Sequence, residues 1–316
     1  MPGKWSRFAI LAVAIALLPS ACSHQSPSPT TQAWSSESPR TYRAFVPSSF
    51  GQIHVRVVEA KNDDLPARRT LVLLHPTPYS SDYFKAFAPV MGMDRRVLAV
   101  DTPGYGDSAP PPEPQTMSAY AGAIIMALDA LREDNEPYDI LGYHTGTLLA
   151  AEIAALRPDL IHRLVLPGVP YFTGDAQHEA YERNVKAPTL SPDGAHLDAP
   201  WGFATYAVPA GLSIASAQEH FGDMMQCYPT CWWAYHGVFS YPADDRFRSV
   251  QQPTLLISVD GSLEAETKAA VGHFSNGHHL HLSGITRGIF DLEVARIASV
   301  VRDFLDNNQS TASDRP

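Results

Sequence analysis

Basic residues are scarce in this chain of 316 residues. Lysine and arginine number 23 against 33 aspartates and glutamates, so the net charge is −10. No cluster of five or more basic residues occurs, so the sequence lacks the positive surface that nucleic-acid binding requires. Long apolar runs are also missing, since none reaches the roughly 18 residues that a membrane-spanning helix needs. These absences exclude a nucleic-acid partner and a membrane protein with several spans.

The sequence has enough apolar side chains to fill a sizeable core. Hydrophobic residues make up 45% of it and charged residues 18%, a balance typical of globular proteins and unlike that of disordered ones. Its length suits one large α/β domain or two smaller ones.

The N-terminus has the features of an export signal. Lys4 and Arg7 precede an apolar stretch at residues 8–18, and we expect residues 1–21 to be a signal peptide. The sequence LPSAC that ends at Cys22 resembles a bacterial lipoprotein cleavage box, with proline where such boxes usually carry leucine. The resemblance implies a lipid on Cys22, attachment to a membrane, and a periplasmic or cell-surface location. The alternative is ordinary secretory cleavage nearby.

Composition also predicts the boundaries of the folded part. Residues 22–40 are rich in serine, proline and threonine and cannot bury enough apolar surface to fold, so we expect a flexible tether. We assign residues 41–306 to one folded domain and residues 307–316 to a flexible tail.

Two further cysteines, Cys227 and Cys231, lie in the sequence CYPTC. An oxidising compartment would allow them to pair, and Pro229 between them disfavours a regular helix. We therefore expect a local disulfide; the alternative is two free thiols in a packed loop. Two sulfurs without a well-spaced partner motif do not indicate a zinc site.

The hydrophobic pattern predicts strands that alternate with helices. Alternating apolar and polar residues predict a hairpin of strands at residues 41–46 and 53–59. Short apolar runs are typical of buried strands and occur at residues 71–74, 97–100, 138–141, 161–166 and 253–259, with a last strand at 279–282. Helical spacing occurs at residues 81–91, 116–131, 144–156 and 292–305. This order predicts an α/β fold with a mostly parallel central sheet flanked by helices, whose ligands bind beyond the carboxyl ends of the strands.

Two loops carry a resemblance to a known family. Residues 101–108, DTPGYGDS, are similar to the D-x-P-G-x-G-x-S loop after the fourth strand of α/β-hydrolases. Residues 142–146, GYHTG, lie between a predicted strand and a predicted helix and resemble the G-x-S-x-G nucleophile elbow of the same family. The match extends in the expected order over most of residues 41–305. It implies the α/β-hydrolase fold and hydrolysis of an ester, lactone or related acyl bond.

His144 stands where the family carries its nucleophile. Gly142 and Gly146 leave room for the tight turn, and histidine is among the residues that tolerate a positive φ. Three roles are consistent with this position. The imidazole is itself the nucleophile, or it is a general base that activates water, or the elbow is inactive and the pocket only binds.

The loop after residues 71–74 resembles the family's oxyanion loop, H-G-x-P. Here it is formed by His75, Pro76, Thr77 and Pro78, and the two prolines have no N–H to donate. The backbone N–H groups of Thr77 and Thr145 are therefore the predicted oxyanion donors, and His75 is a candidate for substrate binding. The alternative is a rigid proline turn with no donor role.

The resemblance implies an acid after the strand at residues 253–259 and a histidine before the last helix. Asp260 is the candidate acid and would orient His144, with Glu264 behind it, and a surface turn at Asp260 is the alternative interpretation. Arg287 occupies the position of the usual histidine. It cannot act as a base, but it can hold an anionic substrate or a developing oxyanion, or it can be a solvated loop residue.

Four histidines lie in or near the last predicted strand, residues 279–282: His273, His278, His279 and His281. Strand alternation places His279 and His281 on one face. Metal binding by these histidines is the weaker alternative, because no carboxylate falls at a helpful spacing in the sequence; we predict no metal site and no cofactor.

Residues 170–250 interrupt the alternation of strands and helices and are rich in proline and aromatic residues. We expect a mainly helical cap, inserted after the sixth strand, over a pocket for a small apolar or aromatic substrate. These aromatic residues also have to pack the cap onto the core. A binding protein without turnover and a cofactor-free lyase are the alternatives to a hydrolase.

Overall fold

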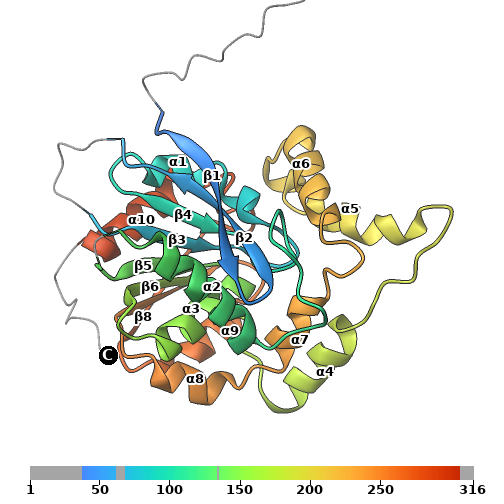
Figure 1. Cartoon of the computed structure of the whole chain (residues 1–316). Helices are drawn as coiled ribbons and strands as arrows, with labels where there is room; N and C mark the ends of the chain where they lie inside the picture. Colours follow the sequence, from blue (N-terminus) through green and yellow to red (C-terminus); the bar gives the residue numbers. More distant parts are fainter. Residues whose placement is uncertain (1–37, 62–67, 134, 307–316) are drawn as a thin grey trace, which may run out of the picture. The chain divides into compact units, whose positions relative to one another are not determined.

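A sheet of eight strands runs through the part of the chain that the computed structural model describes, residues 38–61, 68–133 and 135–306 (Figure 1). The expected signal peptide, Cys22, most of the expected tether and the tail lie outside these residues. The strands are β1 (Thr41–Ser48), β2 (Gly51–Val58), β3 (Leu71–Leu74), β4 (Val97–Val100), β5 (Tyr138–Gly142), β6 (Ile161–Pro167), β7 (Thr254–Val259) and β8 (Gly277–Leu282).

The strand order is β1-β2-β4-β3-β5-β6-β7-β8. Strands β1 and β2 pair antiparallel, as do β2 and β4, and every later pair is parallel. Each predicted strand is present, and the ends that do not coincide differ by one or two residues. The predicted mostly parallel sheet is confirmed.

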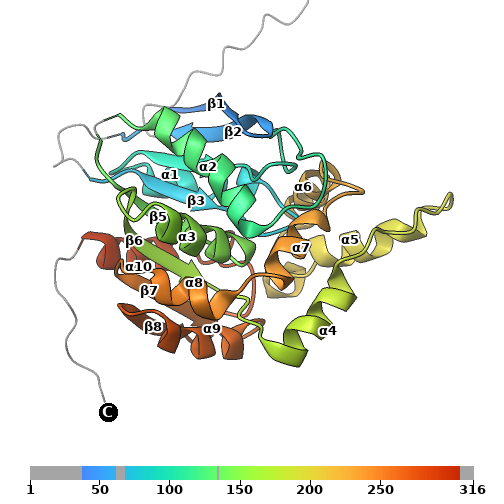
Figure 2. The same cartoon turned by 60° about the horizontal axis from the view of Figure 1, so that its bottom comes forward.

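The two faces of each central strand pack against different helices. In β3, Val72 and Leu74 join a core cluster with residues of α2 and α3, whereas Leu71 and Leu73 join a second cluster with residues of α1 and α10. Side chains alternate between the faces of a strand, so a strand covered on both faces needs a continuous apolar sequence. Figure 2 shows α2 and α3 in front of the sheet. The helices outside the cap are η1 (Ser81–Phe84), α1 (Phe87–Met91), α2 (Met117–Leu131), α3 (Thr145–Leu156), α9 (Glu264–Ala270), η4 (Val271–His273) and α10 (Val294–Asp306).

The segment between β6 and β7 forms the predicted helical cap. Figures 1 and 2 show α4 to α7 beyond one end of the sheet, the end where the parallel strands finish. The cap elements are α4 (Gly174–Asn184), η2 (Ala195–Leu197), α5 (Asp198–Ala204), η3 (Val208–Ala210), α6 (Ile214–Met225), α7 (Trp233–Phe239) and α8 (Ala243–Ser249).

A disulfide joins Cys227 and Cys231 between α6 and α7. The bridged turn contacts the rest of the domain, because the Tyr105 hydroxyl donates to the carbonyl of Cys231 (2.7 Å) and accepts the N–H of Ala234 (3.1 Å). The predicted pairing of the two cysteines is therefore present. Among the described residues, none of the helices combines the length and apolarity needed to cross a membrane.

A buried carboxylate attaches the last cap helix to the sheet layer. Glu152 of α3 is fully buried and accepts two hydrogen bonds from Arg246 of α8, at 2.6 and 2.9 Å. It also accepts hydrogen bonds from Ser118 of α2 and from Tyr241. Buried carboxylates are stable only with such partners, because leaving water costs a charge several kcal/mol.

Replacement of Glu152 by alanine should therefore lower the free energy of unfolding by about 3–5 kcal/mol, because Arg246 loses its partner in a low-dielectric environment. Urea unfolding at pH 7 measures the change. Glu136→Ala is the matched control: its exposed carboxylate contacts Arg69 at 3.5 Å, and such surface pairs contribute about 0–1 kcal/mol. Equal effects of the two substitutions would contradict the role of the buried network.

Candidate active site

His144 lies at a sharp turn between β5 and α3. Its backbone has φ 48° and ψ −113°, a positive φ that residues other than glycine rarely adopt. The N–H groups of Gly146 and Thr147 close the turn by donating to the carbonyls of Tyr143 and His144 (2.9 and 2.8 Å). This strained strand-to-helix turn lifts the side chain of His144 out of the sheet at the first residues of a helix.

The glycines beside His144 are required by the close approach of three backbone segments. A Cβ on Gly142 would lie 2.0 Å from the carbonyl oxygen of Gly146, and a Cβ on Gly146 would lie 2.1 Å from that of Leu74. Both distances are far below van der Waals contact, and both atoms belong to backbone. The turn can form only with glycine at these two positions.

The imidazole of His144 is half-buried. It packs on the Tyr143 ring, with 4.0 Å between ring centroids, and on Gly168 after β6, where a Cβ would lie 2.6 Å from Cδ2 of His144. Neither ring nitrogen hydrogen-bonds to another described residue. The nitrogens of His144 are therefore left for a partner from outside the described chain.

Burial lowers the pKa of His144 to about 4, because the charged imidazolium loses its hydration. The positive end of the α3 dipole lies at the same place and acts in the same direction. The imidazole is therefore neutral at pH 7 and keeps a lone pair for attack on carbon or for accepting a proton.

Two backbone donors lie close to the elbow. Thr145 is the first residue of α3, so its N–H has no acceptor within the helix. The N–H of Thr77 donates to the Thr145 hydroxyl at 3.4 Å, a long and weak bond, and the Thr77 carbonyl accepts from the cap residue Tyr235 at 3.3 Å. The two predicted oxyanion donors are thus brought together.

His75 is fully buried and links two loops. Its Nε2 accepts the N–H of Thr102 at 2.9 Å, and its Nδ1 lies 3.1 Å from the carbonyl of Pro76. Both nitrogens have protein partners, and burial lowers the pKa of His75, so the ring is neutral. The structure places His75 between loops, with no nitrogen left for a substrate.

Asp260 directly follows β7 and makes no hydrogen bond to His144 in the described structure. Its carboxylate contacts Nε2 of His281 (2.9 Å) and accepts the N–H of Gly284 (2.7 Å), and these contacts, the backbone N–H first, hold its pKa below the ordinary value. The expectation that Asp260 orients His144 is therefore corrected: it orients His281. The reason is register, since β8 pairs directly with β7 and brings His281 next to the end of that strand.

Arg287 contacts the cap. Its guanidinium stacks on the Tyr206 ring, with 3.9 Å from Cζ to the centroid, and it donates to the Tyr206 carbonyl. It makes no contact with His144, Thr77 or Thr145 in the described structure. The position that carries the usual histidine in the family is therefore used to hold the cap.

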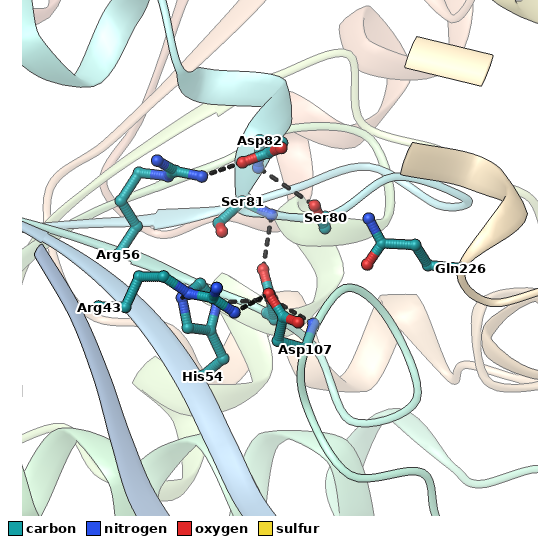
Figure 3. Close-up of a pocket in the computed structure, with 9 residues that line it drawn as sticks. Arg43, His54, Arg56, Ser80, Ser81, Asp82, Asp107 and Gln226 are labelled. Carbon is teal, nitrogen blue, oxygen red and sulfur yellow. Dashed lines mark hydrogen bonds and ion pairs between the residues drawn. The ribbon is translucent and has the colours of Figure 1, made fainter. Parts of the chain in front are cut away.

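Two cavities lie near the cap, and His144 lines neither of them. One, of about 120 Å³, is polar and contains the buried His54–Asp101 pair (2.7 Å) with Arg43 and Arg56 (Figure 3). The other, of about 210 Å³, lies between α6, η1 and the loop after β8. Its lining includes His220 and Asp291, 3.2 Å apart, and Asp223.

The sequence analysis did not identify His220 and Asp223 of the cap helix α6 as candidate functional residues. Asp223 accepts hydrogen bonds from the backbone N–H (2.9 Å) and the hydroxyl of Ser80. His220 packs on Tyr83, which in turn stacks on Tyr143 beside the elbow (5.6 Å between centroids in each pair). The only available signal was helical spacing, since residues 220 and 223 are one turn apart on α6; their partners are distant in sequence.

Comparisons with known proteins agree with this architecture. A family model described as alpha/beta hydrolase fold matches residues 69–205. A hydrolase from Pseudomonas aeruginosa PA01 superposes with a TM-score of 0.71 at 18% identity, over 84% of this chain and 98% of that one. This chain therefore has the α/β-hydrolase fold. An enol-lactonase from Burkholderia xenovorans LB400 (TM-score 0.68, 16% identity, 84% and 100% covered) and an esterase from Rhodococcus sp. ECU1013 (0.68, 22%, 84% and 99%) share the fold.

Matches to curated sequence relatives of this chain are shorter. Two pimeloyl-[acyl-carrier protein] methyl ester esterases of Neisseria meningitidis, from serogroup A strain Z2491 and serogroup B strain H44/76, are 32% and 33% identical over 124 residues. The match covers 39% of this chain and 37% and 45% of those proteins. The chain therefore aligns with less than half the length of these curated relatives.

Asp223 allows a test of how the cap is held. Burial raises its pKa to about 6, so between about pH 4 and pH 6 the folded protein keeps a proton that the unfolded chain has lost. The contribution of Asp223 to the free energy of unfolding then falls as the pH rises, by about 3 kcal/mol for a shift of about two pKa units. In Asp223→Asn this fall should disappear, as measured by urea unfolding at pH 4, 5, 6 and 7.

The exposed cap carboxylate Asp198 supplies the matched control. Asp198→Asn should keep the pH dependence of the wild type. If Asp223→Asn also keeps it, burial does not hold the carboxyl of Asp223 protonated.

Proposed function

We propose that this protein is an exported hydrolase that cleaves an ester, lactone or related acyl bond in a small apolar or aromatic molecule, with His144 as the reacting group. One observation carries the proposal. A neutral imidazole with free nitrogens stands on the strained turn, at φ 48°, where this fold presents its reactive side chain.

In the reaction we favour, a ring nitrogen of His144 attacks the acyl carbon. The carbonyl oxygen becomes an oxyanion and accepts hydrogen bonds from the N–H groups of Thr145 and Thr77, the latter exchanging its weak bond to the Thr145 hydroxyl. The carbon–oxygen bond to the alcohol then breaks, and the leaving oxygen takes up the proton of the second ring nitrogen through solvent. Water cleaves the acyl-imidazole, releases the acid and restores the neutral ring.

The same geometry supports His144 as a general base. In that case the imidazole removes a proton from water, the resulting hydroxide attacks the acyl carbon, and the proton passes to the leaving alcohol. No acyl group is then attached to the protein. A burst of alcohol release before the steady state, proportional to the protein concentration, distinguishes the two routes, because only the acylated protein can produce it.

The comparisons support the reaction class. The proteins that share the fold are named hydrolase, enol-lactonase and esterase, and the Neisseria relatives are named for a methyl ester. Aromatic rings of the cap support an apolar or aromatic substrate, since Phe203 stacks on Tyr79 at 5.8 Å and Tyr79 packs on His220.

The disulfide supports export. Structural disulfides persist in oxidising compartments such as the periplasm or the cell surface, and Cys227 and Cys231 are paired. Together with the signal-like residues 1–21 and the cleavage box at Cys22, this supports a periplasmic or cell-surface lipoprotein whose lipid anchors it to a membrane.

One specific observation favours a second candidate, a binding protein without turnover. Asp260 is paired with His281, and Arg287 is stacked on the cap, so the two positions that complete the triad in the family serve other contacts. A pocket without an orienting acid can still bind the same class of molecule.

Replacement of His144 by asparagine tests the proposed role. Asparagine tolerates a positive φ, so the turn should survive while the reactive ring is lost. We expect hydrolysis of chromogenic short-chain esters to fall roughly 100-fold or more, the scale on which a positioned acid–base group acts. The exposed His178 of α4 gives the control His178→Asn, which should match the wild type.

Equal rates for His144→Asn and the wild type would contradict the assignment of His144. If neither protein hydrolyses any ester or lactone of a panel while both bind the same compounds, the binding protein is favoured over the hydrolase.

A further inference from the structure

The two positions that complete the triad in the family have other partners in this chain. The carboxylate of Asp260 contacts Nε2 of His281 (2.9 Å), and the guanidinium of Arg287 stacks on the ring of Tyr206 and donates to its carbonyl. Neither side chain contacts His144 in the described structure. A group that leaves from an acyl carbon at the elbow therefore receives no proton from these two positions.

Side chains around the oxyanion loop have already given their protons to the protein. The Tyr235 hydroxyl donates to the carbonyl of Thr77 (3.3 Å), and burial raises the pKa of Tyr235 to about 12. The Tyr105 hydroxyl donates to the carbonyl of Cys231 (2.7 Å). His75 has protein partners at both ring nitrogens. Each of these groups would have to break a hydrogen bond before it could protonate a substrate.

The ring of His144 has no acidic or charged neighbour among the described residues. Burial lowers its pKa, and neither a hydrogen bond nor a charged side chain contributes to that shift. The Tyr143 ring packs on it, with 4.0 Å between centroids. Burial raises the pKa of Tyr143, so this phenol is a poor proton donor. His144 is therefore a weakly basic nucleophile without an acid partner.

This combination selects which group leaves after attack on an acyl carbon. The tetrahedral intermediate can expel either the imidazole or the original leaving group, and the group whose conjugate acid has the lower pKa leaves faster. An alkoxide is about as basic as hydroxide, whose conjugate acid, water, has a pKa near 15.7. A phenol has a pKa of about 10 and a thiol of about 8.5. Without a proton donor, an alkyl ester releases the imidazole again, whereas an aryl ester or a thioester can go forward.

We propose that the His144 site is selective for activated acyl compounds, namely aryl esters, enol esters or enol lactones, and thioesters, over ordinary alkyl esters. The inference rests on the proposed function, in the form in which His144 is the nucleophile. A ring nitrogen forms a bond to the acyl carbon and the carbon–oxygen or carbon–sulfur bond breaks. The electron pair leaves as a phenolate, enolate or thiolate, and the second ring nitrogen loses its proton to solvent. Water then cleaves the acyl-imidazole and restores the neutral ring.

The oxyanion donors do not alter this selection. The N–H groups of Thr145 and Thr77 act on the carbonyl oxygen of the acyl group, which is the same in an alkyl and an aryl ester. They stabilise the intermediate whichever group it later expels. The leaving group is therefore the feature that separates the two classes of substrate.

The test uses the full chain and pairs of substrates with one acyl group and nearly the same shape. A phenyl ester is paired with a cyclohexyl ester, and an S-butyl thioester with a butyl ester. Each kcat/KM is divided by the rate constant of the same compound with hydroxide. The phenyl ester and the thioester should then exceed their partners at least roughly 100-fold, since a positioned acid contributes about 10²–10⁴-fold and this site has none. The butyl pair contains no aromatic ring, so it separates leaving-group chemistry from a preference for rings.

Two variants assign the selection to the proposed groups. His144→Asn should lose most of its activity towards the phenyl ester and the thioester, because the nucleophile is gone. Tyr235→Phe should keep the ratio between the phenyl and cyclohexyl esters, whatever its overall rate, because the proton of Tyr235 is not used in the reaction.

Each remaining outcome counts against the inference. Similar normalised values for both members of each pair overturn it and leave the proposed hydrolase in place, since such a site has a proton donor or uses His144 as a base. A loss in Tyr235→Phe that is confined to the cyclohexyl ester identifies Tyr235 as that donor and also overturns it. If none of the four compounds is hydrolysed, the proposed function fails together with the inference.

Discussion

The structure depends on one steric constraint, the contact of three backbone segments at the elbow. The carbonyl oxygens of Gly146 and Leu74 occupy the space where side chains at residues 142 and 146 would lie. This contact brings the start of α3 against the end of β3. It forces a positive φ on His144 and sets Thr145, the first residue of α3, next to Thr77, whose N–H donates to the Thr145 hydroxyl. The electrostatics follow from this placement, because a half-buried ring that loses hydration at a helix N-terminus remains neutral.

The groups that usually complete such a site have other partners here. Asp260 holds His281 on the edge strand, and Arg287 holds Tyr206 of the cap. The imidazole of His144 is consequently left without an orienting acid, which suits a neutral nucleophile better than a base that must become charged. The cap contacts the loop that contains Thr77, because the Tyr235 hydroxyl donates to the carbonyl of that residue.

The local sequence pattern was sufficient to predict the architecture and the elbow. Short apolar runs gave the strands, and the glycines around His144 gave the turn, because both depend on neighbours in sequence. The partner of Asp260 was predicted wrongly, and the hydrogen bonds between Asp223 and Ser80 were not foreseen. The contact of Asp260 depends on strand register. The contact between Asp223 and Ser80 joins residues 143 positions apart in sequence and depends on how the cap folds onto the core. The helix α9, which brings Glu264 towards His281, is too short for its sequence pattern to be recognised.

The pH dependence of ester hydrolysis tests the central claim most directly, because it reports the ionisation of the reacting group. Initial rates should stay constant from pH 8 to about pH 5 and fall by half near pH 4, where the buried imidazole of His144 gains a proton. Return of each sample to pH 7 separates this titration from unfolding. A fall by half between pH 6 and pH 7 would assign the reaction to an ordinary, solvated histidine and would contradict the account.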